Sequence, residues 1–113
     1  MELKITVRLC TPEGQRCFGP GLAELLEQVE QRRSLRSAAM AMGMAYSKAW
    51  RILRTAEAGL GCKLLDSTTG GRHGGGAVLT VEGRRLLTAY RSYVEDIEGY
   101  CQEKYKEGFP FLP

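Results

Sequence analysis

Residues 34–60 read SLRSAAMAMGMAYSKAWRILRTAEAGL, and this stretch decides the fold. Ser34 is placed to cap a short helix over residues 35–42, because its hydroxyl can accept a bond from a backbone N–H of the first turn. Gly43 ends that helix as a C′ glycine, and a third helix follows over residues 45–59. Two helices joined by a tight glycine turn are typical of a helix-turn-helix. An ordinary helical hairpin has the same spacing, so both interpretations stay open here.

The residues upstream predict a β-hairpin followed by a first helix. Apolar side chains recur at every second position, the period of a half-buried strand: Leu3, Ile5, Val7 and Leu9. Turn residues follow at 11–14, and a short return strand over 15–18 completes a hairpin of residues 1–18. The first helix is predicted over 22–32, from an i, i+3, i+4, i+7 stripe of Leu22, Leu25, Leu26 and Val29. The three-helix core thus spans residues 22–60.

Downstream, two short strands predict a wing over residues 63–80, with strands at 63–67 and 77–80. A glycine-rich tip, residues 70–76, lies between them. Thr80 can cap a last helix over residues 81–106, and an apolar tail follows at 107–113. At about 1.5 Å per residue this helix is about 40 Å long, too long to pack wholly on so small a domain. Its 3-4 apolar stripe needs a partner, most simply a second copy of the chain: Leu86, Tyr90, Tyr93, Ile97 and Tyr100.

Composition and charge exclude several classes of protein. The chain has 113 residues, 43% of them hydrophobic, which fits one globular domain of residues 1–113. We find no apolar stretch near the ~18 residues of a membrane span. The alternating N-terminus is not a signal peptide, and four cysteines without one indicate reduced thiols in the cytoplasm. Residues 32–91 hold 11 Lys/Arg against 3 Asp/Glu, a net +8 between acidic flanks of −2 and −3, which indicates a surface for a polyanion.

The third helix carries the candidate DNA-reading face. At about 100° per residue, one side is apolar and should face the core: Ala49, Leu53, Ala56 and Leu60. Ser47, Arg51 and Arg54 point roughly opposite, Lys48 and Trp50 lie on the flanks, and Tyr46 is half-buried at the N-terminal end. Arg can bridge the guanine O6 and N7 acceptors in the major groove, and Ser can serve bases or phosphates. The alternative is a solvated charged face.

The wing tip is the second candidate contact with DNA. Its glycines let the backbone approach a phosphate chain, and Arg72 could enter a minor groove. The candidates here are Gly71, Arg72, His73 and Gly74. A nucleotide-phosphate loop is not indicated, because no GxxxxGK[ST] pattern is present. A flexible loop without a ligand remains the alternative.

Enzymatic and metal-binding functions have no motif here. His73 is the single histidine, and the cysteines lack C-x₂₋₄-C spacing, so we expect no metal site. The sequence also contains no nucleophile elbow, carboxylate pair or cofactor fingerprint, so it predicts neither an enzyme nor a cofactor.

Three segments together resemble the ModE family of molybdate-responsive transcription factors: FGPG at 18–21, AAMAMGMAYSKAW at 38–50 and TGGRHGGGAVLT at 69–80. More narrowly, they are similar to its N-terminal winged helix-turn-helix DNA-binding domain and to the LysR-type reader head. The resemblance covers about residues 3–91. It implies a recognition helix that opens at Tyr46-Ser47-Lys48 and a wing on the DNA backbone or minor groove. It also implies a homodimer joined through the first and last helices, which adds Leu22 and Leu26 to the predicted interface.

The chain departs from that family in four ways. The family's molybdate-binding module follows the DNA-binding domain, whereas this chain stops at Pro113, so we expect no molybdate sensing by this chain alone. Ala45 stands where a capping Ser is usual, which costs the helix start about 1 kcal/mol. Arg36 replaces a small polar residue near the second helix and adds a candidate phosphate contact, and Ser37 beside it is a further candidate for DNA binding. His73 replaces a wing glycine.

The sequence therefore predicts a mainly α fold with small β elements: a winged helix-turn-helix with an N-terminal β-hairpin and a long C-terminal dimerisation helix. The predicted function is sequence-specific regulation of transcription by a homodimer on an inverted-repeat DNA operator, without its own effector domain. A separate effector-binding partner stays open. The first alternative is a protein-interaction module that has lost DNA reading, and the second is a thiol redox sensor through Cys62 or Cys101.

Overall fold

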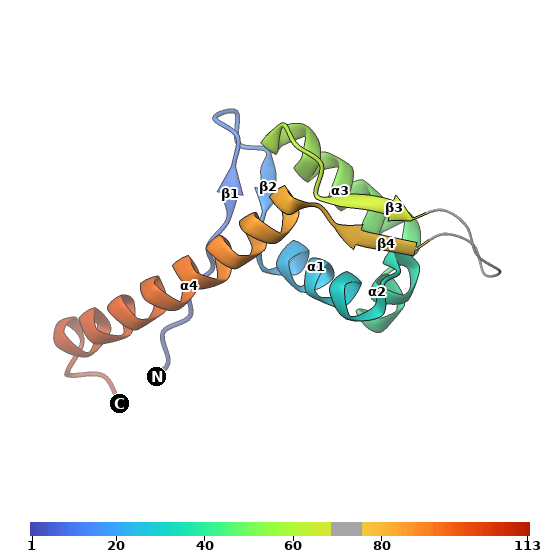
Figure 1. The fold of residues 1–113 in the computed structure, drawn as a ribbon. Coiled ribbons are helices and arrows are strands. Elements are labelled where there is room, and N and C mark those ends of the chain that lie inside the picture. Colours follow the sequence, from blue (N-terminus) through green and yellow to red (C-terminus); the bar gives the residue numbers. More distant parts are fainter. Residues whose placement is uncertain (69–75) are drawn as a thin grey trace.

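The computed structural model describes residues 1–68 and 76–113 (Figure 1). Its elements are β1 (Leu9–Cys10), β2 (Arg16–Phe18), α1 (Pro20–Arg32), α2 (Leu35–Ala41), α3 (Tyr46–Leu60), β3 (Leu65–Thr68), β4 (Gly76–Leu79) and α4 (Val81–Gly108). The strands form two antiparallel pairs, β1 with β2 and β3 with β4. The mainly helical winged fold is as predicted, and each helix begins and ends within about two residues of its predicted bounds.

Helix α1 lies at the centre of the core. The largest fully buried side chains come from β2, α1, α3 and the segment before β3: Phe18, Leu25, Leu26, Val29, Leu53 and Leu64. Alanines at the helix contacts are also buried, among them Ala38 and Ala39 of α2 and Ala49 of α3, so the helices can approach closely. Each large apolar side chain contributes roughly 1.5–3 kcal/mol by leaving water, which fixes α2 and α3 against α1.

The turn between α2 and α3 follows the predicted chemistry. The backbone N–H of Ser37 donates to Ser34 Oγ at 3.0 Å, so Ser34 caps α2. Gly43 has a φ of 65°, a left-handed conformation that a residue without a Cβ adopts at little cost. Ala45 is the N-cap of α3 and makes no side-chain cap bond. The stretch therefore forms the two helices and the tight glycine turn that the sequence predicts.

The β3–β4 pair, the base of the wing, is attached to both ends of the core. Its register pairs Leu65 with Leu79 and Thr68 with Gly76, one to two residues away from the predicted strand bounds. The Ala77 N–H donates to the Arg33 carbonyl at 3.1 Å, which joins β4 to the α1–α2 junction. A Cβ at Gly76 would lie 2.6 Å from that same carbonyl oxygen, so the close approach requires glycine.

The predicted strand over residues 3–9 is wrong for most of its length. Only Leu9 and Cys10 pair with β2, and residues 1–8 lie outside any ladder. The alternation of half-buried and exposed side chains is real, but helix α4 covers this segment instead of a strand. The Tyr90 hydroxyl donates to the Val7 carbonyl at 2.8 Å, and Gln102 Nε2 donates to the Leu3 carbonyl at 3.2 Å.

Helix α4 begins on the core and then leaves it (Figure 1). Thr80 caps it by accepting from the Gly83 N–H at 2.9 Å, and its own hydroxyl donates to the Lys63 carbonyl at 2.6 Å. Gly83 is packed so tightly against the Leu64 carbonyl that a Cβ would collide with it. The helix accounts for the elongated shape of 61 × 29 × 23 Å.

Three side chains predicted at a dimer interface lie instead in the core of the single chain. Leu22 is 4% exposed, Leu26 is fully buried and Tyr90 is 5% exposed. Tyr90 packs edge-on against Phe18, with ring centroids 5.0 Å apart. The stripe on α1 faces inward because α2, α3 and α4 all pack on that helix. These three side chains are therefore removed from the predicted interface.

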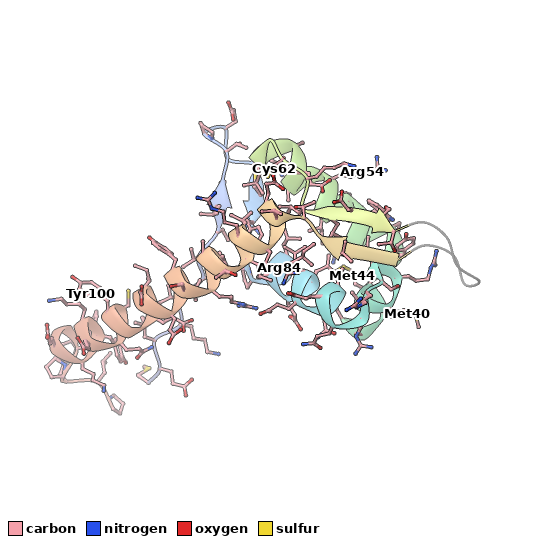
Figure 2. All side chains as sticks on the ribbon, in the orientation of Figure 1. Met40, Met44, Arg54, Cys62, Arg84 and Tyr100 are labelled. Carbon is pink, nitrogen blue, oxygen red and sulfur yellow. The ribbon has the colours of Figure 1, made fainter. Side chains whose placement is uncertain are left out.

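The other predicted interface residues lie nearer the surface of α4. Leu86 and Ile97 are half-buried, whereas Tyr93 is 55% and Tyr100 60% exposed. Figure 2 shows Tyr100 on the part of α4 that extends beyond the core. The apolar tail after α4 is also exposed at Phe109 and Phe111.

Candidate nucleic-acid interface

The outer face of α3 has the orientation that its helical spacing predicts. Ser47, Arg51 and Arg54 are exposed, while Ala49 and Leu53 on the opposite side are buried. On the flanks of α3, Lys48 is exposed, and Tyr46 and Trp50 are half-buried. A hydroxyl and two guanidinium groups therefore project from the helix that follows the tight turn.

Two arginines stack on the aromatic flank of α3. The Arg36 guanidinium carbon lies 4.2 Å from the centroid of the Tyr46 ring. Tyr46 packs edge-on to Trp50 at 6.2 Å between centroids, and the Arg54 guanidinium carbon lies 5.2 Å from the Trp50 centroid. The rings thus orient one guanidinium from α2 and one from α3, and each cation–π contact contributes about 0.5–1 kcal/mol at an exposed position.

The predictions from the sequence do not include this stack, although the spacing of residues on α3 indicates part of it. Tyr46, Trp50 and Arg54 recur at i, i+4 spacing, which places neighbours on one face of a helix. The approach of Arg36 across the turn depends on the angle between α2 and α3, which no local pattern encodes. The sequence predicts Arg36 as a candidate phosphate contact, and the structure adds that its guanidinium lies over the Tyr46 ring of α3.

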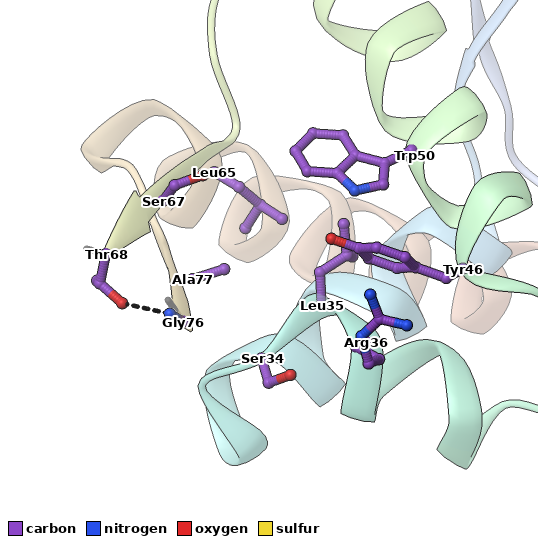
Figure 3. Close-up of a pocket in the computed structure, with 10 residues that line it drawn as sticks. All are labelled: Ser34, Leu35, Arg36, Tyr46, Trp50, Leu65, Ser67, Thr68, Gly76 and Ala77. Atoms are coloured by element: carbon purple, nitrogen blue, oxygen red, sulfur yellow. Dashed lines mark hydrogen bonds between the residues drawn. The ribbon is translucent and has the colours of Figure 1, made fainter. Parts of the chain in front are cut away.

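A hollow of about 450 Å³ separates the aromatic flank of α3 from the wing base (Figure 3). We call it the wing hollow; it is lined by Ser34, Leu35, Arg36, Tyr46, Trp50, Leu65, Ser67, Thr68, Gly76 and Ala77. At its strand side, the Gly76 N–H donates to Thr68 Oγ1 at 2.8 Å. Ser37 lies beside it in the first turn of α2 and is half-buried. The wing base and the recognition helix thus border one concave surface.

The predicted contacts at the wing tip fall outside the described residues: Gly71, Arg72, His73 and Gly74. The structure places only the two ends from which that segment departs, Thr68 on β3 and Gly76 on β4. Both ends border the wing hollow, next to Arg36 and Tyr46 of the helix-turn-helix.

The basic side chains of this surface have no carboxylate partners within the described ranges 1–68 and 76–113. No ion pair joins Arg36, Lys48, Arg51 or Arg54 to an acidic side chain there. The acidic residue of α3, Glu57, turns toward the protein, where its carboxylate accepts from the Leu64 N–H at 2.7 Å. The outer face therefore keeps its positive charge, which suits a polyanionic ligand.

The same described part of the chain contains no group of three metal-ligating side chains and no helix apolar enough to cross a membrane. Among its cysteines, Cys17 is buried in the core, Cys62 and Cys101 are half-buried and Cys10 is exposed.

Comparison with known proteins finds relatives in sequence and solved structures of similar fold. The molybdenum transport protein ModE of Herbaspirillum seropedicae is 36% identical over 90 residues, which are 80% of this chain and 30% of that protein. The transcriptional regulator ModE of Haemophilus influenzae is 32% identical over 89 residues, 79% of this chain and 34% of that protein. This chain thus spans about a third of the length of these relatives.

A crystal structure described as a CbnR_DBD–DNA complex has the same fold, with a TM-score of 0.56 and 22% sequence identity. The alignment covers 76% of this chain and 92% of that one. Residues 21–84, from α1 into the first turn of α4, match the family described as bacterial regulatory helix-turn-helix protein, lysR family. The chain therefore belongs to the lysR family of bacterial regulatory helix-turn-helix proteins, and within it resembles ModE.

Proposed function

We propose that this protein is a sequence-specific DNA-binding regulator of transcription that places α3 in the major groove. The observation that carries the proposal is the outer face of α3, where Ser47, Arg51 and Arg54 are exposed. No carboxylate of residues 1–68 or 76–113 pairs with the two arginines. A major groove about 12 Å wide admits one α-helix, and Arg is the side chain that most often reads guanine there. Arg51, midway along the face, is our candidate for the main base contact.

The flanks of this face would bind the DNA backbone. Arg36 and Ser37 of α2 lie on one side of this face and Lys48 of α3 lies on the other. All three would contact phosphates, as would the wing segment with Arg72 and His73. Contacts to phosphates position a protein on the duplex, and contacts to base edges select the sequence. Tyr46, stacked under Arg36, would hold that guanidinium in place and line the entrance to the groove.

We also propose that the protein acts as a homodimer through the exposed part of α4. The candidate contacts that remain after Leu22, Leu26 and Tyr90 are assigned to the core are Leu86, Tyr93, Ile97 and Tyr100. A two-fold dimer presents two recognition helices, so its operator is an inverted repeat with half-sites about one helical turn, roughly 34 Å, apart. The relatives named above include transcriptional regulators, which agrees with this role.

The test is selection of fragmented genomic DNA by the purified protein, with and without molybdate, followed by sequencing and measurement of the mass of the free protein in solution. We expect a shared inverted repeat among the captured fragments and twice the mass of the chain. Absence of an enriched motif would contradict the proposal and favour a protein-interaction module of the same fold. Tyr100→Ala is the matched variant for the dimer, because this exposed side chain is outside the core and its loss should weaken association alone.

A further inference from the structure

A second basic hollow lies between α3 and the N-terminal β1–β2 pair, with a volume of about 600 Å³. We call it the hairpin hollow; it is lined by Arg8, Gln15, Arg16, Cys17, Phe18, Gly19, Gly21, Leu22, Lys48, Arg51, Ile52 and Thr55. Four of these residues are basic and none is acidic. Within residues 1–68 and 76–113, none of the four basic side chains forms an ion pair.

The hairpin hollow lies on the opposite flank of α3 from the wing hollow. Helical spacing places Lys48, Ile52 and Thr55 on one flank and Tyr46 and Trp50 on the other, with the outer face between them. Lys48, Ile52 and Thr55 line the hairpin hollow, whereas Tyr46 and Trp50 line the wing hollow. Figure 1 shows the β1–β2 and β3–β4 pairs on different sides of α3. Arg51 borders the hairpin hollow while it also belongs to the outer face.

The hairpin is held in a fixed position on α3. The Cys17 side chain fits against Gly59 so closely that a Cβ at Gly59 would collide with its sulfur. The Arg8 side chain lies over Gly19, where an added Cβ would be 2.9 Å from Arg8 Nη1. Arg16 pairs with Cys10 in the short ladder, while its side chain remains exposed. The basic groups of the hairpin are thus placed beside α3 before any ligand binds.

We propose that Arg8 and Arg16 make a second DNA-backbone contact, which binds a phosphodiester group on the side of α3 away from the wing. A helix in the major groove has a phosphate backbone along each edge of that groove. Elements on both flanks of α3 therefore meet different backbones: the wing side meets one and the hairpin side meets the other. This inference rests on the proposed function and adds to it a contact that lies outside the matched family region, residues 21–84.

The charges favour a phosphodiester of the bound duplex over other ligands. Four cations without a carboxylate repel one another, and an anion relieves this repulsion. The hollow is continuous with the outer face of α3 through Arg51, so DNA bound on that face would extend over it.

The experiment compares Arg16→Ala with Lys106→Ala, which removes the same charge from an exposed position in the last turn of α4. Binding to the selected operator is measured between 50 and 200 mM salt. In the proposed dimer, Arg16→Ala removes one phosphate contact from each protomer. The slope of log affinity against log salt should therefore fall by about 1.8 for the bound dimer, and affinity should change over this range by about twelvefold less than for the native protein. Arg16→Lys should restore most of the slope, and Lys106→Ala should retain all of it.

A neutral methylphosphonate at single positions of the operator locates the contact. We expect one position in each half-site, outside the bases read by α3, where this change weakens the native protein but not Arg16→Ala. Equal slopes for Arg16→Ala and Lys106→Ala, together with a normal effect of Arg51→Ala, would overturn this inference and leave the proposed function intact. If the native protein selects no DNA, both proposals fail.

A titration with inorganic phosphate, without DNA and at constant ionic strength, tests whether the hairpin hollow binds a free phosphate ion and not a DNA phosphodiester. We expect no saturable binding. Saturable binding that Arg16→Ala removes, with an unchanged salt slope for DNA, would make the hairpin hollow a small-anion site and would overturn the DNA-backbone contact.

Discussion

Arginine occurs in two regions of this molecule in opposite electrostatic states. On α2 and α3, Arg36, Arg51 and Arg54 have no carboxylate partner among the described residues. On α4, Arg84 pairs with Glu30 and Arg91 pairs with Glu27, and both acidic residues belong to α1. Figure 2 shows Arg54 and Arg84 on different elements of the molecule. The contrast identifies which part of the positive charge is available to a polyanion.

The paired and unpaired arginines explain why the distribution of charge along the sequence does not by itself locate the surface for a polyanion. The segment with net charge +8, residues 32–91, contains both groups of arginine. Tertiary packing brings carboxylates from the acidic N-terminal third to α4 and leaves α3 without them. Exposed ion pairs contribute only about 0–1 kcal/mol to stability, so the main consequence of these pairs is to neutralise the α1–α4 side.

The largest expected effect is a loss of DNA affinity in Arg51→Ala, which removes one of the unpaired arginines. Removal of a bidentate contact to guanine costs about 1–3 kcal/mol and should relax the preference at one base pair of each half-site. Thermal stability should remain close to that of the native protein, because the side chain is exposed and makes no ion pair. Affinities for the operator and for its single-base variants provide the measurement.

Arg84→Ala is the matched control, since it removes the same charge from the paired region. We expect the same base preferences as for the native protein and a small change in stability. A relaxed base preference in Arg84→Ala, or an unchanged one in Arg51→Ala, would contradict the assignment of the DNA-reading face.

Much of the fold follows from local signals in the sequence. Ser34, Gly43 and Thr80 mark helix ends because their chemistry acts within one turn, and all three do so in the structure. The predicted N-terminal strand is largely absent, because the alternation of Leu3, Ile5 and Val7 identifies the inward side chains but not the element that covers them. Helix α4 covers them here, across about 80 to 100 residues of sequence separation.

In the candidate site, too, local signals predict some features, and tertiary packing decides the others. Helical spacing was sufficient to orient Ser47, Arg51 and Arg54 outward, because that face depends on α3 alone. The family resemblance places Leu22 and Leu26 of α1 at a dimer interface, whereas both face the core, since an apolar stripe does not identify its partner. Arg8 and Arg16 were also not singled out, because they reach α3 only after the hairpin packs on it.

Loss of one neutral hydrogen bond on the α4 side should have the next largest effect. Tyr90→Phe keeps the edge-on packing against Phe18 but removes the bond to the Val7 carbonyl, which should lower the free energy of unfolding by about 1 kcal/mol. Denaturant unfolding measures this change. The DNA affinity of the folded variant should be unchanged. A native-like stability would mean that residues 1–8 are not held to α4 by this bond.

The same residue predicts a dependence of stability on pH. Burial raises the pKa of the Tyr90 phenol above its ordinary value of 10.0, and the nearby charges of Arg91 and Arg8 oppose this shift. The folded state therefore favours the neutral phenol, so its contribution is complete below pH 10 and is lost as the pH rises further. Unfolding of the native protein and of Tyr90→Phe across pH 9–11 should show the two stabilities converging above pH 10. Parallel curves would contradict this assignment.

The aromatic flank of α3 should show a smaller effect, limited to binding. Tyr46→Leu removes the ring under Arg36 and keeps an apolar side chain, so the guanidinium loses about 0.5–1 kcal/mol of cation–π contact and its fixed orientation. We expect two- to fivefold weaker binding to all DNA sequences alike. Arg36→Ala should give a similar loss, and the double variant should lose little more, because the two residues act through one contact. Additive losses would show that Tyr46 and Arg36 act independently.

The smallest expected effect concerns the ion pairs between α1 and α4. A double-mutant cycle of Glu27→Gln and Arg91→Gln should give a coupling energy of about 0.2–1 kcal/mol in unfolding, because the Arg91 side chain is 43% exposed and water screens the pair. The hydrogen bond that Arg91 donates to Glu27 raises the pKa of Arg91, so the guanidinium is charged at every practical pH and the coupling should weaken only with added salt. The informative measurement is DNA binding by Glu27→Gln alone. If an unpaired arginine is what attracts the polyanion, freeing Arg91 should strengthen non-specific binding slightly and leave the base preferences set by α3 unchanged. An altered base preference would show that α4 lies in the DNA interface, and the contrast between the two regions would then no longer hold.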